Sequence, residues 1–240
     1  MSEPTFALWT YLTRTPLLWL TVTLIAYLAA DRISLATRRH PVCNPVLLSV
    51  AIVALVLWAT GTAYPVYFEG AQFVHFLLGP ATVALAIPLW DNRRIVLRSL
   101  VPMLAALVVG SLTAIVSAVV IAQAFDLPRT IVLSLAPKSV TAPVAMGITE
   151  TLGGDPSLTA VLVLITGVIG SVIVTPLMNC LRIRDWRARG FSAGLASHGI
   201  GTARAFTVHP LAGTFAGIAM GLNALVTALL LPVALRWLLG

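Results

Sequence analysis

Six apolar segments, most of them long enough to cross a lipid bilayer as helices, dominate this 240-residue sequence. A spanning helix needs about 20 residues, so the segment at 44–60 is short and the one at 95–124 is long enough to tilt. Only 10% of the residues are charged, whereas soluble domains carry about 25%. We therefore predict an all-α polytopic membrane protein with a single membrane domain over residues 1–240. The six segments are 16–36, 44–60, 72–90, 95–124, 156–181 and 209–237.

Two further stretches, at about 129–152 and 187–207, are interrupted in the middle by polar residues, glycine or proline. The interruptions read APKSVTAP at 136–143 and SHGIGTAR at 197–204. Irregular backbone at membrane depth is tolerated where it is buried in protein or lines a cavity. Transporters often build their substrate sites from such broken helices. The alternative is that proline and glycine merely kink two ordinary spanning helices.

The distribution of arginine distinguishes these arrangements. If both stretches return to the side from which they entered, ten arginines face one side and three face the other; if both cross, the division is seven against six. The positive-inside bias favours the first arrangement. We predict two re-entrant hairpins from opposite faces, with the N-terminus outside. The ten are Arg32, Arg38, Arg39, Arg93, Arg94, Arg98, Arg182, Arg184, Arg187 and Arg189, and the three are Arg14, Arg129 and Arg236.

The first apolar segment has a second interpretation. Arg14, the apolar run at 16–28 and the following Ala-Ala-Asp resemble a cleavable signal peptide. The run is about long enough to span, however, and Arg32 follows it with two more arginines nearby, as in a stop-transfer flank. We predict a retained first helix.

Cations, and no carboxylates, lie in the middle of the two interrupted stretches. All eight acidic residues fall at segment ends or in loops, whereas Lys138 and Arg204 lie within the interruptions. An ionisable group at membrane depth costs several kcal/mol and points to a functional site. Without a buried carboxylate these cations need another anion, and a bound substrate carboxylate would supply it. The alternative is that both side chains snorkel to the membrane surface.

The residues around these cations favour an anion site. One half-helix is expected to start near Ser139 or Thr141, and a second near Ser197 or Gly199. Their N-termini would present unpaired N–H groups and a positive dipole end to an anion. The alternatives are a satisfied core histidine at 198 and hydroxyls bonded to their own backbone. The predicted substrate-binding residues are Lys138, Ser139, Thr141, Ser197, His198, Gly199, Gly201, Thr202 and Arg204.

Other function classes find little support in the sequence. It contains no H-E-x-x-H, G-x-S-x-G or phosphate-loop motif, so we predict no enzyme and no cofactor. The net charge of +7 comes from clusters between apolar runs, which argues against nucleic-acid binding. Cys43 and Cys180 are too far apart for a metal signature. The sequence does not specify a coupling ion; a proton bound by His198 is one option, because histidine titrates near physiological pH.

Three blocks of this sequence resemble the LrgB/CidB family: LAPKSVTAPVAM at 135–146, GGDPSLTA at 153–160 and GLASHGIGTARA at 194–205. Residues 76–85 also fit. The resemblance implies a multi-pass protein of the bacterial plasma (inner) membrane. It also implies a holin-like or antiholin-like protein that modulates murein hydrolases, commonly with a separate LrgA/CidA-type membrane partner. It also implies relatedness to a plastidic glycolate/glycerate translocator and to bacterial proteins linked to pyruvate movement. Ala142 and Gly147 stand where many relatives have Thr and Glu.

The charges and the resemblance together predict a carrier of small organic monocarboxylates such as glycolate, glycerate or pyruvate. We expect six spanning helices, two re-entrant hairpins and a homodimer. A weak similarity between residues 78–83 and 135–140 suggests an inverted repeat. The alternative function is a holin/antiholin-like regulator of murein hydrolase export and cell lysis that forms or controls a pore.

The predicted topology can be tested by cysteine accessibility after Cys43 and Cys180 are replaced with serine. Asp155→Cys should react with a membrane-impermeant thiol reagent added outside intact cells, because the loop at 155 is predicted outside. Arg187→Cys should react only when the reagent reaches the cytoplasm. Reaction of both residues from the same side would contradict the arrangement of re-entrant hairpins.

Overall fold

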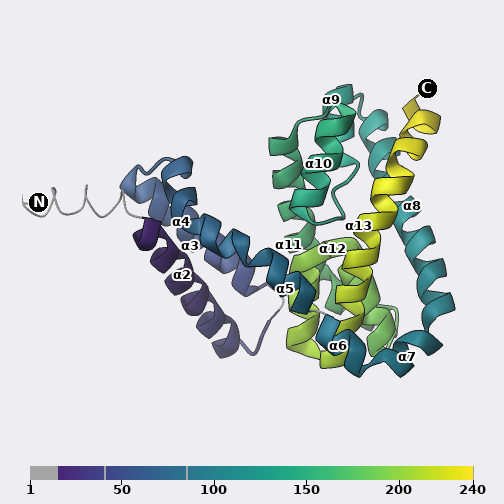
Figure 1. Ribbon diagram of the computed structural model, residues 1–240, viewed down its shortest axis with the longest axis horizontal. Coiled ribbons are helices and arrows are strands. Elements are labelled where there is room, and N and C mark those ends of the chain that lie inside the picture. Colours follow the sequence, from purple (N-terminus) through teal and green to yellow (C-terminus); the bar gives the residue numbers. More distant parts are fainter. Residues whose placement is uncertain (1–15, 41, 85, 240) are drawn as a thin grey trace, which may run out of the picture. The chain divides into compact units, whose positions relative to one another are not determined.

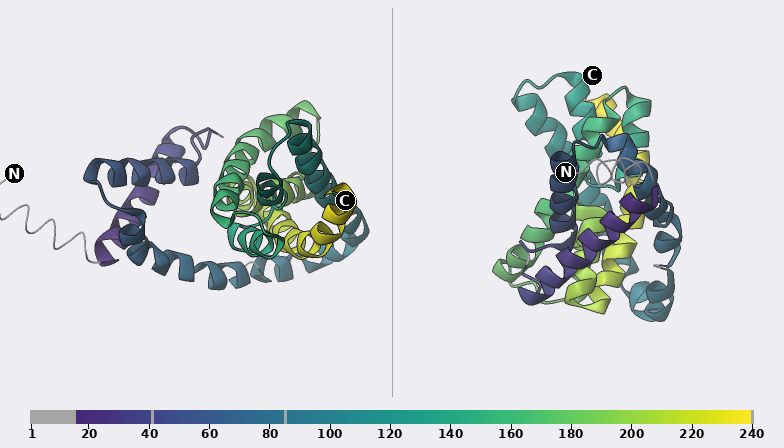
Figure 2. Two further views of the ribbon diagram at one scale, coloured as in Figure 1. Left: turned by 90° about the horizontal axis from the view of Figure 1, so that it is seen from above. Right: turned by 90° about the vertical axis from the view of Figure 1, so that its left-hand side faces the viewer.

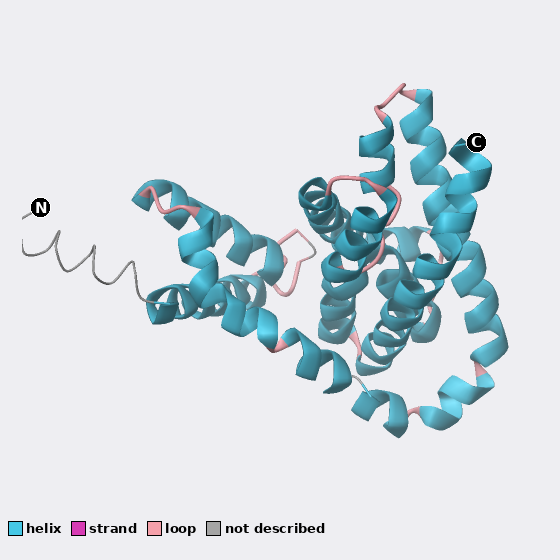
Figure 3. Cartoon of the chain, turned by 45° about the horizontal axis from the view of Figure 1, so that its top comes forward, coloured by secondary structure: helices cyan, strands magenta, loops and turns pink. Residues whose placement is uncertain are grey.

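Helices account for all the regular structure in residues 16–40, 42–84 and 86–239, the part of the chain that the computed structural model describes (Figure 3). The chain divides into two compact units, Met1–Ala86 and Ile87–Gly240. Arg14, which the arginine count assigns to the outer side, lies outside the described residues.

The first unit is a small helical cluster. Asn44 Oδ1 accepts a hydrogen bond from Val46 N at 2.8 Å and so caps α3, which ends at Gly61 in the left-handed conformation that glycine adopts without strain. Close packing of α2 on α4 needs Gly70, because a Cβ there would lie 2.8 Å from Trp19 Cβ. The helices are α2 (Pro16–Ala36), α3 (Pro45–Thr60), α4 (Tyr64–Phe76) and α5 (Leu78–Ala84), and α6 (Ala86–Asp91) follows at the boundary.

The second unit contains both interrupted stretches. Its long helices run alongside one another, with α12 packed against both α11 and α13 (Figure 1, Figure 2). α13 also packs on α8. The elements are α7 (Arg93–Arg98), α8 (Leu100–Ala124), α9 (Arg129–Leu135), α10 (Ala142–Leu152), α11 (Pro156–Cys180), α12 (Trp186–Val208) and α13 (Pro210–Leu239).

The predicted apolar segments are found as helices. Five helical segments are long and apolar enough to cross a membrane, namely α2, Tyr64–Asp91, α8, α11 and α13, and α3 is a shorter apolar helix, as predicted. Side chains such as Leu225 and Leu229, one helical turn apart on α13, are 65% and 74% exposed. Large apolar faces of this kind are costly in water and suited to lipid. The protein is therefore an all-α, multi-pass membrane protein.

Two segment boundaries differ from the prediction. The segment expected at 72–90 begins earlier, at Tyr64. The segment expected as one tilted helix over 95–124 is divided at Ser99, where α7 ends and α8 begins. Pro102 explains the division, because it has no N–H to pair with the carbonyl of Arg98 and its ring would clash there.

The first interrupted stretch is a helical hairpin. α9 has 7 residues and α10 has 11, so neither is long enough to cross a bilayer. The chain after α10 returns to α9: Asp155 N donates to Ser134 Oγ at 2.8 Å, and Thr159 Oγ1 donates to the carbonyl of Ser134 at 3.0 Å. The turn between the two helices, at residues 136–141, is the tip of the hairpin.

The second interrupted stretch is also a hairpin. Within α12 the backbone leaves the helical conformation at Ser197 (φ −128°, ψ 16°) and His198 (φ 40°, ψ −131°). The arms on either side run back along each other, because the ring of Trp186, at the start of α12, stacks on His209, just after its end, with centroids 4.9 Å apart. The break is thus the tip of this hairpin.

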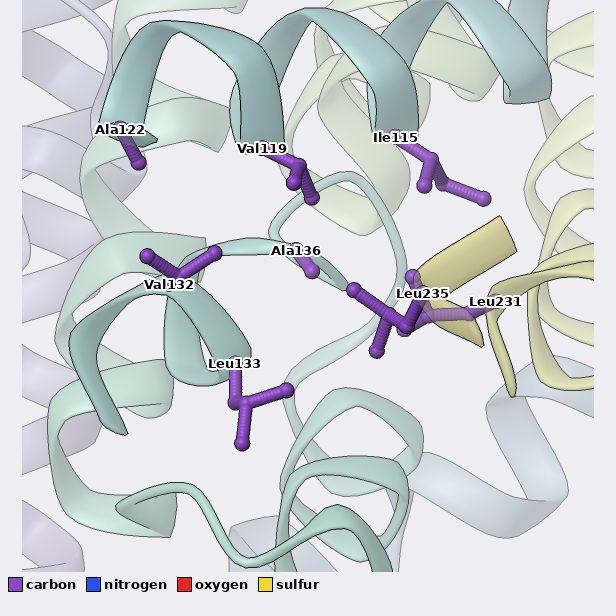
Figure 4. Close-up of a cluster of buried hydrophobic side chains, with 8 residues drawn as sticks. All are labelled: Ile115, Val119, Ala122, Val132, Leu133, Ala136, Leu231 and Leu235. Carbon is purple, nitrogen blue, oxygen red and sulfur yellow. The ribbon is translucent and has the colours of Figure 1, made fainter. Parts of the chain in front are cut away.

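The two hairpins enter from opposite ends of the helix bundle. Arg187, at the start of α12, donates to Ser99 Oγ beside the N-terminus of α8. The α9–α10 hairpin instead packs against the C-terminal halves of α8 and α13, which Gln123 Nε2 links by a hydrogen bond to the carbonyl of Leu238. Figure 4 shows the apolar cluster at that end, formed by residues of α8, α9, α13 and the first tip. The predicted pair of opposed hairpins is confirmed.

Each hairpin is followed by one long helix, α11 after the first and α13 after the second, so the order of elements repeats with inverted direction. The short sequence similarity between residues 78–83 and 135–140 does not correspond to this repeat. Residues 78–83 are helical in α5, whereas residues 135–140 form the end of α9 and the first tip.

Glycine at 194 is predicted to be essential for the close packing of α12 on α13. A Cβ there would lie 2.7 Å from Ala216 Cα, so Gly194→Ala should cost about 1–3 kcal/mol of stability through overpacking. The matched control is Gly221→Ala in α13, where a Cβ would meet nothing within 4 Å. Thermal unfolding in detergent should show a lower midpoint for Gly194→Ala and an unchanged or raised midpoint for the control.

Candidate functional site

The tips of the two hairpins are joined by one buried side chain, Asn223 in the middle of α13. Its Nδ2 donates to the carbonyl of Ser139 in the first tip at 3.2 Å and to the carbonyl of Leu195 just before the second tip at 3.1 Å. Its Oδ1 accepts from Ser111 Oγ at 2.6 Å and from Thr227 Oγ1 at 3.3 Å. All four hydrogen-bonding positions of the amide are therefore used.

A second link between the tips runs through Val163 of α11. Its side chain packs in an apolar cluster with Val140 and Ala145 of the first hairpin. Its carbonyl lies 3.0 Å from His198 Nε2 in the second tip. A carbonyl can only accept, so His198 Nε2 carries the hydrogen of this bond. The predicted meeting of the two interrupted stretches is thus found near the middle of α11 and α13.

Two glycines of α11 make room for the second tip. A Cβ at Gly167 would lie 2.6 Å from His198 Cε1, and a Cβ at Gly170 would lie 2.9 Å from Ser197 Cβ. The tip therefore rests directly on the backbone of α11. This support holds His198 at a positive φ, a conformation that is uncommon for residues other than glycine.

Both half-helices begin at the tips, as the sequence predicts. α10 starts after Thr141, which has extended backbone and makes no side-chain capping hydrogen bond. The second arm of α12 starts after His198, whose carbonyl accepts from Thr202 Oγ1 at 2.8 Å. Each start directs a positive helix end toward the region where the tips meet.

Lys138 lies at the first tip, one residue before the carbonyl that Asn223 binds. Its side chain is half-buried, and its ammonium makes no hydrogen bond or ion pair with any residue in the described part of the chain. At the second tip, Ser197 Oγ is buried and has no hydrogen-bond partner among the described residues. The site thus contains one cation, Lys138, and one buried hydroxyl, Ser197 Oγ, that have no hydrogen-bond or ion-pair partner among the described residues.

Arg204 lies elsewhere than the sequence analysis assumes. It lines a small pocket with Thr175, Trp186 and Arg189, at the open end of the second hairpin. One and a half turns of helix separate it from the tip. The structure therefore brings Lys138, Ser139, Thr141, Ser197 and His198 into the two joined tips, but not Arg204. Gly199, Gly201 and Thr202 lie in the first turns of the second arm.

A close approach of the two arms explains Gly201. A Cβ there would lie 2.6 Å from Ser197 Cβ, so the second arm can fold back only with glycine at this position. Gly199 has more room, with Met220 Sδ 3.9 Å from its hypothetical Cβ. No group of three His, Cys, Asp or Glu side chains suited to a metal ion occurs among the residues that the structure describes.

The sequence analysis missed Asn223, although a signal for it was present. Asn223 is a polar residue near the centre of a predicted span, where an unpaired amide would be costly. A search confined to charged residues and to interrupted stretches passes over it. Ser111 likewise lies near the centre of a predicted span, in α8. Serine is so common in membrane helices that its presence alone does not indicate a role.

The LrgB-like family matches residues 23–237 of this chain. The chain belongs to the LrgB-like family. This confirms the resemblance in the sequence blocks at 135–146 and 194–205. No solved structure matches the chain.

Several bacterial relatives of this LrgB-like protein are similar over nearly their whole length. YxaC of Bacillus subtilis is 35% identical over 219 residues, which cover 90% of this chain and 94% of the relative. YwbG of the same organism is 34% identical, with 96% of its length covered. The holin-like protein CidB of Staphylococcus aureus is 30% identical over 217 residues, with 94% of its length covered.

Asn223→Ala is predicted to destabilise this LrgB-like protein strongly. The substitution leaves two buried carbonyls and two hydroxyls without the partner that joins the tips, at a cost of about 2–4 kcal/mol. Asn179→Ala, at an exposed position near the end of α11, is the matched control. Thermal unfolding in detergent should separate the two variants, and equal midpoints would show that Asn223 does not hold the tips together.

Proposed function

We propose that this LrgB-like protein is a carrier of small organic monocarboxylates, in particular 2-hydroxy or 2-oxo acids such as glycolate, glycerate and pyruvate. The observation that carries the proposal is the junction of two hairpin tips, each with a helix N-terminus, beside a lysine without an anionic partner among the described residues.

The charge at this junction suits an anionic guest. A lysine at membrane depth is costly unless a counter-ion is present. Glu150, the one carboxylate of the first hairpin, is exposed near the end of α10, away from the tip. Asp155, which follows the hairpin, is engaged as the N-cap of α11, where it accepts from Ser157 N and Leu158 N. A substrate carboxylate at Lys138 would provide the missing charge. It would also interact favourably with the positive ends of α10 and of the second arm of α12.

The hydroxyl groups at the tips fit the second functional group of such acids. Ser139 and Thr141 lie in the first tip, and Ser197 lies in the second. A 2-hydroxy or 2-oxo group next to a carboxylate can accept a hydrogen bond from these hydroxyls while the carboxylate faces Lys138. The proposed site therefore offers a partner for each of the two functional groups of a short 2-hydroxy or 2-oxo acid.

Control of a pore is the second candidate function, and the names of the relatives favour it. Staphylococcal relatives are named holin-like proteins. A holin-like or antiholin-like protein would form a pore or regulate one, together with a small LrgA/CidA-type partner. Such a protein would pass unrelated solutes of similar size, or none when alone.

Uptake into liposomes separates the two candidates. We expect purified protein in liposomes to take up radiolabelled glycolate, glycerate or pyruvate with saturation and to show counterflow when unlabelled acid is inside. Leakage of unrelated solutes such as glycerol at comparable rates would instead indicate a pore. An absence of both would overturn the carrier.

Lys138 provides a sharp test of the site, because it is the single lysine of the sequence. Lys138→Ala should reduce uptake at least tenfold through loss of the counter-charge, and Lys138→Arg should retain part of it. Arg129→Ala, an exposed cation at the start of α9, is the matched control and should transport normally. Equal uptake by Lys138→Ala and the control would contradict the role of Lys138.

A further inference from the structure

A cavity of about 360 Å³ lies between α8 and the first arm of α12, at the end of the bundle that is rich in arginine. Its lining includes the charged and polar residues Arg98, Ser99 and Arg187. Apolar side chains, among them Phe191 and Phe215, line the rest of it. Its volume is within the range of small-molecule sites, and it is separate from the hairpin tips described above.

Three helices connect this cavity to the tips in steps of four residues. Four residues advance a helix by about 6 Å and return to the same face, so each step forms a layer across the bundle. The first layer, at the cavity, contains Met103, Phe191 and Phe215. The second layer contains Leu107, Leu195 and Ala219. The third contains Ser111 and Asn223, which bind each other and hold the tips.

A single apolar layer therefore separates the cavity from the tip region. Leu107 is 2% exposed and packs in one cluster with Leu195 and Ala219. Leu195 lies against α8 where Gly110 leaves room, since a Cβ there would be 3.0 Å from Leu195 Cδ2. In this layer α12 meets α8 through Leu195 beside Gly110, so a small separation of these two helices would open it.

The mouth of the cavity carries a net positive charge. Arg187 is paired with Asp185 and also donates to Ser99 Oγ at 3.2 Å, which fixes the guanidinium at the rim. The hydrogen bond from Arg187 lowers the pKa of Asp185, so this carboxylate stays ionised. Arg98 is exposed and forms no ion pair with the residues that the structure describes. With two cations, Arg98 and Arg187, and one anion, Asp185, the mouth of the cavity attracts negatively charged solutes.

We propose that this cavity is the cytoplasmic access vestibule for small organic carboxylates, and that the layer of Leu107, Leu195 and Ala219 is its gate. The inference rests on the proposed carrier function. Arg98 binds the carboxylate at the mouth, and the acid passes to the tips when Leu195 moves away from α8. Ala219 adds little bulk to the layer, so the two leucines supply most of the barrier.

Thiol labelling tests the vestibule without measuring transport. In a background with Cys43→Ser and Cys180→Ser, Ala106→Cys in the cavity wall should react with an anionic methanethiosulfonate reagent applied from the cytoplasmic side. Millimolar pyruvate or glycolate should slow this reaction several-fold, and Arg98→Gln should abolish the protection. Val109→Cys, which faces outward on α8 and is 64% exposed in the wild type, is the control and should not react.

The gate is tested by the same reagent one layer deeper. Ser111→Cys should react at least tenfold more slowly than Ala106→Cys, and Leu195→Ala should remove most of this difference. If Leu195→Ala fails to fold, Leu107→Ala serves the same purpose. Equal reaction rates of Ala106→Cys and Ser111→Cys, measured with Leu107 and Leu195 unchanged, would overturn the gate.

Transport measurements distinguish failure of the vestibule from failure of the carrier. Arg98→Gln should raise KM for uptake several-fold with little change in the maximal rate, whereas Arg94→Gln, also in α7 but outside the cavity, should leave both unchanged. If uptake depends on Lys138 but pyruvate and glycolate do not slow the reaction of Ala106→Cys, the vestibule is overturned and the carrier function stands. Protection without uptake would support the anion site and overturn the carrier. Protection only by anionic phospholipid would show that a lipid headgroup occupies the cavity.

Discussion

The structure depends on how two interrupted helices satisfy their backbone polar groups inside a membrane. Hydrocarbon offers no hydrogen bonds, so each carbonyl released at a break must find a partner in the protein. Asn223 supplies that partner for both breaks at once, through the carbonyls of Ser139 and Leu195. One amide thus fixes the depth of both tips and their distance from each other.

The need to bring both tips into the interior of the bundle also explains the glycines around them. A tip can reach the centre of a bundle only if the neighbouring helices give up side-chain volume, and Gly167 and Gly170 of α11 do so for Ser197 and His198. Glycine at 194 allows the first arm to lie directly on α13. The first arm and α13 therefore form a closely packed pair, whereas α8 contacts them through longer side chains such as Leu107. Relative movement is easier at the contact with α8.

The arrangement of the hairpins was predictable because it depends on properties that a sequence displays. Arginine counts reflect the sidedness of whole loops, and the dense polar, proline and glycine residues at 136–143 and 197–204 mark the two interruptions. The division at Ser99 and the position of Arg204 depend instead on local geometry. Pro102 acts on a carbonyl four residues earlier, and Arg204 follows the second tip by enough helix to return toward the open end. Asn223 is visible in the sequence as a polar residue within a span, but its role in joining the tips is not, because Ser111, Ser139 and Leu195 come from segments at least 28 residues away.

The two ends of the bundle close the tip region in different ways. Toward the arginine-rich end, one layer formed by Leu107, Leu195 and Ala219 separates the tips from a cavity. Toward the opposite end, the cluster of Ile115, Val119 and Leu235 with its neighbours fills more than one helical turn behind the first tip (Figure 4). A pore must open both barriers together. A carrier must open them in turn, and barriers that belong to different helix contacts, α8 with α12 at one end and α8 with α9 and α13 at the other, allow this.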